Sequence, residues 1–359
     1  MAGRTSVGLD IGTSGVRAAE LSFGRSGVTL ERFGQVALPA GAVRDGEVVD
    51  ADTVAEAIKQ LWSTVKFSTK KVVLGVANQK VIVRQVDLPW MPEDELRQSL
   101  PFQVQDFIPL PVDQTVLDFH PVEEVVGDGG TRMRRVLLVA AAREMVHNAL
   151  GAAQKAGLKV TQVDLTPFAV LRSLGAVDLL GVGSTWQGDA EALVDIGGKV
   201  TNIVVHQNGV PRFVRVLLMG GDNVTEAVAE RMGVPLEQAE GVKQSTALGA
   251  TPGVPVSEHP AARVVEATGH ALVEEVRGSL DYYLAQPGAS TLRRVLVSGG
   301  GARLGGLVQR LALATRLPVV PATPLSSLKV GKTGLTDDQL KFVEPQVTVP
   351  VGLAMGVAS

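Results

Sequence analysis

The sequence contains no cysteine in its 359 residues. This absence excludes disulfide bonds, thiolate metal sites and cysteine nucleophiles. No window holds 18 uninterrupted apolar residues, so no membrane-spanning helix is predicted. Only Arg4 precedes the first apolar stretch and Asp10 interrupts that stretch early, so we expect no signal peptide and a cytoplasmic protein. Contact with a membrane would then have to come through a partner.

The chain also lacks an excess of positive charge. It has 34 Lys and Arg residues against 37 Asp and Glu residues, which gives a net charge of −3. A broad nucleic-acid-binding surface is normally basic, so no nucleic-acid partner is expected. Apolar residues make up 45% of the chain and charged residues 20%, which is typical of a globular protein, and the length predicts at least two hydrophobic cores.

Most of the chain alternates between short β patterns and amphipathic helices. Two helices have an acidic residue in a position to cap them: Asp52 before a helix ending at Val65, and Asp222 before a helix ending at about Met232. Residues 81–156 depart from this pattern. There, four apolar residues recur at helical spacing before two predicted strands and a further helix: Leu96, Leu100, Val104 and Phe107. We interpret residues 81–156 as a small inserted subdomain.

One internal repeat carries the functional argument. Residues 7–13 and 192–198 share one design, in which an apolar strand ends in Asp-Ile-Gly, followed by a small residue and a second strand. The two aspartates are Asp10 and Asp195. Each repeat opens one half of the α/β pattern, so we expect two lobes that are built alike.

Such a strand-to-turn junction suits a phosphate and its metal ion. Without bulky side chains, the backbone N–H groups of the turn can approach phosphate oxygens closely. The aspartate at the strand end can hold a hydrated Mg²⁺ through its water ligands. A single junction is better explained as an ordinary β-hairpin, but two facing turns would clamp one polyphosphate between them.

A third glycine-rich junction spans Ser298 to Gly306. A flexible loop and a dinucleotide-binding fingerprint are alternative explanations, but the fingerprint spacing is one residue too long and no acidic residue follows the next strand. The sequence Gly331-Lys332-Thr333 lacks the preceding strand and glycine of a P-loop, so we expect a surface loop there. The five histidines show no paired ligand spacing, and no catalytic triad is predicted.

The order of these blocks resembles the superfamily of actin, Hsp70 and the sugar kinases. Its five blocks match residues 10–17, 163–175, 192–205, 294–306 and 347–355. Within that superfamily the chain resembles the family of the type IV pilus assembly protein PilM, most closely at residues 86–96 and 105–109. The cell-division protein FtsA is related but ends in an amphipathic membrane helix, whereas this sequence stops at Ser359, soon after Gly356.

The resemblance implies an α/β fold of the actin-like, ribonuclease H-like type, with two lobes, a nucleotide cleft and a small α+β insert in the first lobe. The expected parts are listed along the chain: lobe 1 at 1–80 and 157–188, the insert at 81–156, lobe 2 at 189–325 with a subdomain at about 222–270, and a return to lobe 1 at 326–359.

The resemblance also implies the nucleotide-binding residues. The first turn and its second strand would bind phosphates through Gly12, Thr13, Ser14 and Arg17. The second turn would bind them from the other side through Gly197, Gly198 and Lys199. Asp10 and Asp195 would hold Mg²⁺ through water. Adenosine would be flanked by Gly299, Gly300, Gly301 and Arg303. Glu240 and Lys243 would contact ribose and adenine, with a surface ion pair as the alternative explanation.

The function implied is that of an ATP- and Mg²⁺-binding scaffold on the inner face of the cytoplasmic membrane. Its implied partners are the N-terminal cytoplasmic tail of PilN and other pilus assembly proteins, and self-association stays open. One alternative is a sugar or small-molecule kinase, for which Asp164 is the nominated catalytic acid, with Asp10 as a second choice. Another is an FtsA-like filament-forming ATPase. The sequence does not decide whether ATP is hydrolysed, and slow hydrolysis is the most that is expected.

Overall fold

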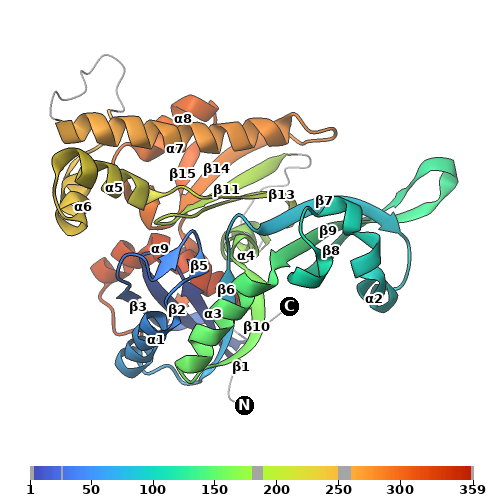
Figure 1. Ribbon diagram of the computed structural model, residues 1–359, viewed down its shortest axis with the longest axis horizontal. Coiled ribbons are helices and arrows are strands. Elements are labelled where there is room, and N and C mark those ends of the chain that lie inside the picture. The colour runs from blue at the N-terminus through green and yellow to red at the C-terminus, as the bar shows by residue number, and fades with distance from the viewer. Residues whose placement is uncertain (1–3, 26, 180–188, 250–259, 357–359) are drawn as a thin grey trace.

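The computed structural model describes residues 4–25, 27–179, 189–249 and 260–356, and the statements on structure refer to these residues. Two α/β lobes lie one above the other, and a smaller unit projects to one side of the lower lobe (Figure 1). Each lobe is built on its own mixed sheet, and the small unit has a three-stranded sheet. The chain therefore has the two-lobed, actin-like fold expected, with an insert in the first lobe.

Lobe 1 contains a six-stranded sheet of order β10-β6-β1-β2-β3-β16. Its strands are β1 (Arg4–Ile11), β2 (Gly15–Gly24), β3 (Gly27–Ala37), β6 (Lys71–Val76), β10 (Lys159–Leu165) and β16 (Lys329–Val330). Helices cover both faces because alternate strand residues are apolar on each side. One face packs on α1 (Ala51–Val65) and α3 (Arg143–Lys155), and the other on α4 (Thr166–Leu179) and α9 (Asp337–Met355). A small hairpin of β4 (Val43–Arg44) and β5 (Glu47–Val48) completes the lobe.

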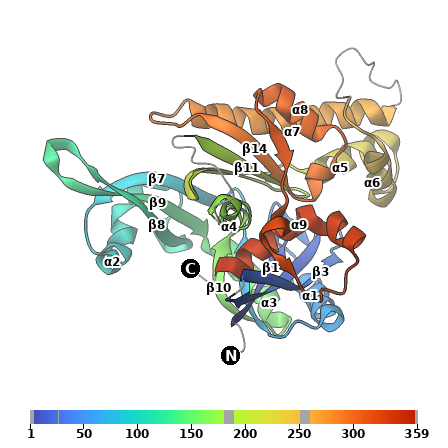
Figure 2. The same ribbon diagram turned by 180° about the vertical axis from the view of Figure 1, so that it is seen from behind.

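The last helix returns to lobe 1 and crosses its sheet closely, as the view from behind shows (Figure 2). Gly8 on β1 leaves no room for a Cβ atom, which would collide with the carbonyl oxygen of Pro350 on α9. Gly352 has the same role where α9 crosses α4, against the carbonyl oxygen of Ala169. The two helices thus lie against each other and the sheet at backbone distance.

Lobe 2 contains a five-stranded sheet of order β13-β12-β11-β14-β15. Its strands are β11 (Ala190–Ile196), β12 (Thr201–Gln207), β13 (Val210–Leu217), β14 (Leu292–Ser298) and β15 (Val319–Pro321). Its helices are α5 (Gly221–Met232), α6 (Leu236–Ser245), α7 (Pro260–Leu284) and α8 (Leu307–Thr315), with short 3₁₀ turns η4 (Gly300–Arg303) and η5 (Pro324–Ser327). The central strands correspond between the lobes: β1 pairs antiparallel with β2 and parallel with β6, as β11 does with β12 and β14. The predicted internal repeat is therefore confirmed in the pairing of the strands.

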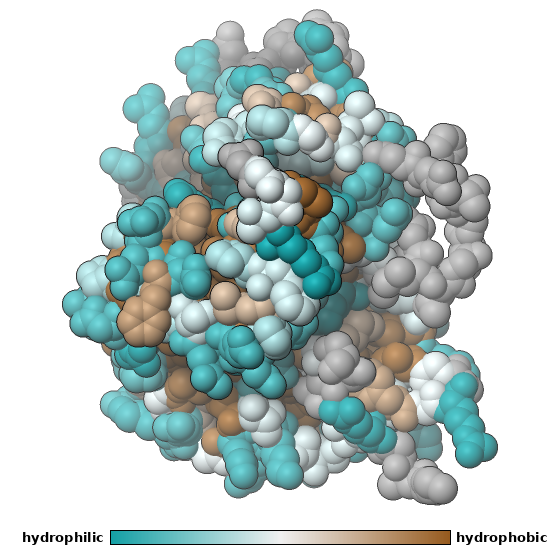
Figure 3. Space-filling model, turned by 90° about the vertical axis from the view of Figure 1, so that its right-hand side faces the viewer, coloured by the Kyte–Doolittle hydropathy of each residue, from teal (hydrophilic) through white to brown (hydrophobic). Residues whose placement is uncertain are grey.

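The insert has a sheet of order β7-β9-β8 with its own core. Its elements are β7 (Val81–Pro89), α2 (Glu93–Gln103), η1 (Gln105–Phe107), η2 (Val112–Gln114), β8 (Thr115–Val126), η3 (Asp128–Gly130) and β9 (Arg132–Ala142). Of the predicted helical face, Leu96, Leu100 and Val104 are buried, whereas Phe107 lies in η1 and is exposed. On the side of the molecule where the insert projects, hydrophilic and hydrophobic surface is interspersed (Figure 3).

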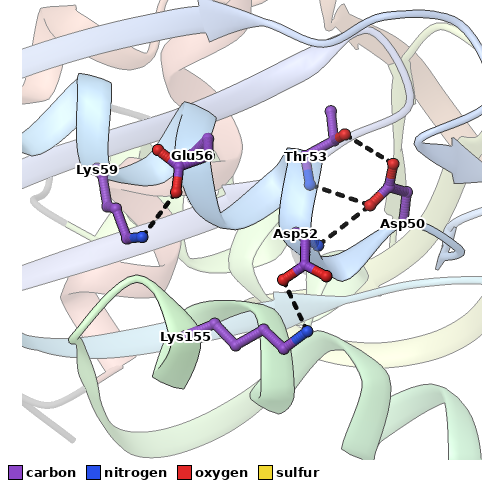
Figure 4. A network of polar contacts seen from close by, with 6 residues as sticks. All are labelled: Asp50, Asp52, Thr53, Glu56, Lys59 and Lys155. Atoms are coloured by element: carbon purple, nitrogen blue, oxygen red, sulfur yellow. Dashed lines mark hydrogen bonds and ion pairs between the residues drawn. The ribbon is translucent and has the colours of Figure 1, made fainter.

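The boundary of the insert differs from the expectation. Helix α3 packs in the lobe 1 core through Met145, Val146 and Ala149, and not in the core of the insert. At its end, Lys155 Nζ lies 2.8 Å from a carboxylate oxygen of Asp52 on α1 (Figure 4). We therefore propose that the insert ends near Ala142 and not at residue 156.

Two helix caps predicted from the sequence are wrong. Helix α1 is capped by Asp50, whose Oδ1 accepts from the backbone N–H groups of Asp52 and Thr53 (Figure 4). Asp52 lies inside the helix, where it is free to pair with Lys155. Helix α5 has Gly220 at its cap position, which places Asp222 in the first turn. No helix among the described residues is both long enough and apolar enough to cross a membrane.

Candidate functional site

A cavity of about 810 Å³ lies between the two lobes. The turns after β1, β11 and β14 all open into it, because the ends of these strands face each other across the cleft. All but one of the predicted nucleotide-binding residues line it: Asp10, Gly12, Thr13, Ser14, Arg17, Asp195, Gly197, Gly198, Glu240, Lys243, Gly299, Gly300, Gly301 and Arg303. The exception is Lys199, whose side chain forms an ion pair with Glu226. Their role in binding stays a prediction, but the fold brings them together.

The turn after β1 carries its own cation. Its backbone is closed by a hydrogen bond from the Gly12 N–H to the Gly15 carbonyl oxygen, at 3.0 Å. Arg17 is the cross-strand partner of Asp10, and Nη1 of Arg17 lies 3.6 Å from Oδ2 of Asp10. Burial raises the pKa of Asp10, and the positive charge of Arg17 opposes that rise. The carboxylate is thus partly compensated from within its own hairpin.

The turn after β11 has no such cation. The Gly197 N–H donates to the Val200 carbonyl oxygen at 2.9 Å, and the cross-strand partner of Asp195 is Asn202. Asp195 is buried and accepts a hydrogen bond of 2.8 Å from the hydroxyl of Ser298. Burial raises the pKa of Asp195 to about 6; the hydrogen bond from Ser298 opposes the rise and the charge of Asp10 adds to it. The two carboxylates therefore act on each other across the cleft.

The two turns touch directly. The backbone N–H of Lys199 donates to the hydroxyl of Thr13 at 3.1 Å, which joins lobe 2 to lobe 1. A Cβ atom at Gly198 would lie 2.6 Å from that hydroxyl and would collide with Oδ2 of Asp222. The N–H of Asp222 donates to the carbonyl oxygen of Gly198 at 2.8 Å. The N-terminus of α5 therefore fixes the second turn, and glycine is required at its tip.

Glu240 and Lys243 form part of the cavity wall. The two residues form the ion pair that the sequence analysis gave as the alternative, with Lys243 buried and Glu240 partly exposed. Nζ of Lys243 lies 2.6 Å from Oε2 of Glu240 and donates to the hydroxyl of Thr225 at 2.9 Å. Burial pushes the pKa of Glu240 upward, but hydrogen bonds from Lys243, Thr225 and Gln244 outweigh it and leave that pKa below its ordinary value. Glu240 is therefore a charged carboxylate, and each of its oxygens already accepts at least one hydrogen bond from a neighbouring side chain.

The third junction completes the cavity on the side of η4. Gly299 has φ of +86°, and a Cβ atom there would collide with the carbonyl oxygen of Ile196. Its N–H donates to the carbonyl oxygen of Pro345 on α9 at 2.8 Å. The guanidinium group of Arg303 stacks over the ring of Phe342, 3.7 Å from its centroid. The junction is therefore a turn that contacts β11 and α9 through Gly299.

Several lining residues were missed in the sequence: Asn202, Asp222, Thr225, Gln244 and Gln346. Asn202 alone had a signal, since it occupies the position in the second repeat that Arg17 has in the first. The others lie on helices α5, α6 and α9, and only the fold brings them to the cleft.

The polar atoms of the cavity fit a phosphate-bearing ligand. Three of its residues have a buried polar atom without a hydrogen-bond partner in the described part of the chain. Arg17 Nε is a donor and suits a phosphate oxygen, whereas Asn202 Oδ1 and Gln346 Oε1 are acceptors and suit a donor group of a ligand or a water molecule. Glycines form the tips of all three turns. Within the same described residues, no group of three or more His, Asp or Glu side chains could hold a metal ion alone. A cation at Asp10 and Asp195 would therefore take most of its ligands from water and phosphate, which suits Mg²⁺.

The acid nominated for a kinase is not in this cavity. Asp164 on β10 forms an ion pair with Arg172 and is not among the lining residues. Burial raises the pKa of Asp164, and Arg172 opposes the rise. A carboxylate held in this way is not available to a substrate hydroxyl in the cleft.

Comparison with known proteins bears on the whole chain. The family model described as type IV pilus assembly protein PilM matches residues 8–357. A solved structure described as the PilM-PilN type IV pilus biogenesis complex has a TM-score of 0.84 and 27% sequence identity, and covers 99% of this chain and 98% of its own.

Other proteins are similar to this chain in sequence or in fold. The cell division protein FtsA of Bacillus subtilis is 26% identical over 84% of this chain and 74% of its own length. FtsA of Neisseria meningitidis serogroup B is 26% identical over 96% and 88%. MreB5 of Spiroplasma citri bound to ADP has a TM-score of 0.51 at 13% identity, covers 99% of each chain and shows the fold alone.

Proposed function

Because the chain belongs to the family of the type IV pilus assembly protein PilM, we propose that it is a nucleotide-binding scaffold of a type IV pilus machine. The observation that carries this proposal is the cavity between the lobes, into which the repeated turns of Asp10 and Asp195 open from opposite sides. The ligand we propose is ATP with Mg²⁺.

In this proposal, different residues contact the phosphates, the Mg²⁺ ion and the adenosine. The N–H groups of the first turn and the guanidinium of Arg17 would hold phosphate oxygens from lobe 1, and the glycines of the second turn would hold them from lobe 2. Asp10 and Asp195 would orient the water ligands of Mg²⁺, which supplies the positive charge that two facing carboxylates lack. Arg303 and the glycines of η4 would flank the adenosine. Lys199 acts through its backbone, since its side chain pairs with Glu226.

The expected effect of binding is mechanical. The lobes meet at the Thr13 to Lys199 hydrogen bond, and a ligand held by both turns would strengthen that closed arrangement. The insert is carried by lobe 1, so closure would fix its position relative to lobe 2. We propose that the surface formed by the insert and the adjoining part of lobe 1 binds the N-terminal cytoplasmic tail of PilN. Through this partner the protein would work at the inner face of the cytoplasmic membrane.

The proposed scaffold function requires ATP binding but does not require ATP hydrolysis or phosphoryl transfer. Because Asp164 is paired with Arg172, Asp10 is the remaining acid that the sequence nominated for a kinase. Asp10 forms an ion pair with Arg17, which weakens it as a base for a substrate hydroxyl. The kinase proposal would be favoured only if ATP turnover rose strongly on addition of a sugar. An FtsA-like filament would be favoured by nucleotide-dependent sedimentation of the purified protein.

The test of the proposal has two parts. Purified protein should show an ATP- and Mg²⁺-dependent rise in its unfolding temperature, and a peptide from the start of the cognate PilN protein should bind with a fixed stoichiometry. A scrambled peptide of the same composition is the control. Without an ATP effect the nucleotide assignment fails, and without specific peptide binding the PilN assignment fails.

A further inference from the structure

The insert contacts lobe 2 as well as the lobe that carries it. One face of its sheet is covered by α2, and the core on that face includes Val136 and Leu138 of β9. Because successive strand residues point to opposite faces, Arg135 and Leu137 lie on the other face. Leu137 is only 1% exposed, so that face is covered too. The element beside it is β13, the edge strand of the lobe 2 sheet, which lies against β7 (Figure 1).

The contact between the insert and β13 has an apolar part near the base of the insert. Val83 of β7 lies on the same face as Leu137, since the two strands pair Val83 with Val139 and Gln85 with Leu137. Val83 packs against the hydrophobic cluster that contains Val214 of β13. This part of the contact is therefore a continuation of the core between the lobes.

The outer part of the contact is a charged network of four residues: Arg212 of β13, Glu123 of β8, Arg135 of β9 and Asp87 of β7. Nη1 of Arg212 lies 3.6 Å from Oε1 of Glu123, and the same oxygen accepts from Nη1 of Arg135 at 3.3 Å. Arg135 is held in turn by Asp87, whose two oxygens accept from it at 2.7 and 2.9 Å. Arg212 is the one member of the network that comes from lobe 2.

This contact and the nucleotide cavity lie on opposite sides of α4. Leu174 of α4 packs in one cluster with Leu193 and Val204 of the lobe 2 sheet, so the helix lies where the lobes meet. In both ribbon views α4 separates the insert from α5 and α6, whose residues line the cavity (Figures 1 and 2). A rotation of one lobe against the other about α4 would therefore change the contact of the insert with β13 whenever it changes the cavity.

We propose that the insert ties lobe 1 to lobe 2 through Arg212, and that this tie stabilises the closed arrangement of the lobes. The hydrogen bond from Lys199 to Thr13 joins the lobes on the side of the cavity, and the charged network joins them on the side of the insert. This inference rests on the proposed nucleotide-binding function and adds the contact that couples the cavity to the insert. Nucleotide binding and the position of the insert are then linked, and the linkage is reciprocal.

The first measurement tests the tie without nucleotide. Because the chain has no cysteine, spin labels can be attached at Gln98→Cys on α2 and Ala271→Cys on α7, which are exposed positions on the insert and on lobe 2. Pulsed electron paramagnetic resonance should give a narrow distribution of distances between the two labels. Arg212→Ala and Glu123→Ala should each broaden that distribution, because each removes the charge that holds the insert to β13.

The second measurement is calorimetric titration with ATP and Mg²⁺. Arg212→Ala and Glu123→Ala should each weaken ATP binding by about two- to fivefold, as expected for a partly exposed ion pair. Since both remove the same contact, the double variant should lose no more than either single variant. Glu124→Ala is the matched control: this neighbouring carboxylate pairs with Arg132 inside the insert, so both measurements should stay unchanged.

The possible failures are distinct. Absence of ATP binding by wild-type protein would sink the proposed function, while the distances between the labels would still test the tie. An unchanged distance distribution in Arg212→Ala would overturn the tie. A broader distribution with wild-type affinity for ATP would overturn its coupling to the cavity, as would losses that add in the double variant. Arg212→Gln removes the charge but keeps much of the side chain, so it serves the same test should the alanine variant fail to fold.

Discussion

The two aspartate turns have the same backbone and different partners. In lobe 1 the cross-strand neighbour of Asp10 is Arg17, and in lobe 2 the corresponding neighbour of Asp195 is Asn202. One turn therefore contains a cation beside its carboxylate, and the other contains a neutral amide. The pKa of Asp195 is raised to about 6 by burial, whereas the rise for Asp10 is opposed first by Arg17.

This difference shows how a repeated fold can make an asymmetric site. The strand pairing fixes where the backbone N–H groups of both turns lie, and the residue seven positions after each aspartate sets the local charge. If the turns bind a nucleotide as proposed, Arg17 would give lobe 1 its own positive charge beside a phosphate, whereas the buried carboxylate of lobe 2 would be stabilised by a bound cation. The predictions below test this contrast between the turns.

The largest effect is expected from alanine at the glycine of the second turn. In Gly198→Ala the new Cβ atom would collide with Asp222 and Thr13, which fix the turn, so ATP affinity should fall by about 100-fold or more. In Gly12→Ala the nearest atom is Arg17 Nη1 at 2.9 Å, the end of a flexible side chain, so the loss should be smaller. Calorimetric titration of both variants decides this, and equal losses would contradict the contrast.

A smaller effect on ATP affinity is expected when Arg17 of the first turn is replaced by asparagine, the residue at the corresponding position of the second turn. Arg17→Asn removes a charged donor from the cavity and should weaken ATP binding by about ten- to 100-fold. Lys199→Ala is the matched cation control: Lys199 does not line the cavity and its side chain pairs with Glu226, so the change should be about fivefold or less. If Lys199→Ala weakened ATP binding as much as Arg17→Asn, the Lys199 side chain would contact the ligand, and the contrast between the two turns would be wrong.

The smallest effect concerns the protein without ligand. Asp195→Asn removes a buried charge and should raise the free energy of unfolding by about 1 to 2 kcal/mol at neutral pH. The gain would be smaller if the variant also weakens the hydrogen bond from Ser298. Asp10→Asn should bring no gain, because it leaves Arg17 without its carboxylate. Denaturant unfolding without nucleotide or Mg²⁺ measures both, and a destabilised Asp195→Asn protein would show that its charge is well accommodated.

The sequence predicted which residues the fold brings together at the cleft, but it did not predict how the elements around them pack. The Asp-Ile-Gly repeat was visible because both turns keep the same local pattern, and it located residues that lie far apart in the chain. Asp222 was misread as a helix cap, because a first-turn aspartate and a capping aspartate look alike without the backbone angles. The position of α3 could not be predicted either, since its apolar face suits the core of the insert as well as that of lobe 1, and Gln346 reaches the cavity only through the return of α9.

The central claim is that one nucleotide is held between the two turns. The most direct measurement is titration of wild-type protein, Asp10→Ala and Asp195→Ala with ATP at saturating Mg²⁺. We predict binding of one ATP per chain by wild-type protein and a large loss in both variants, since each removes one side of the same clamp. Binding that survives in either variant at wild-type affinity would contradict the account.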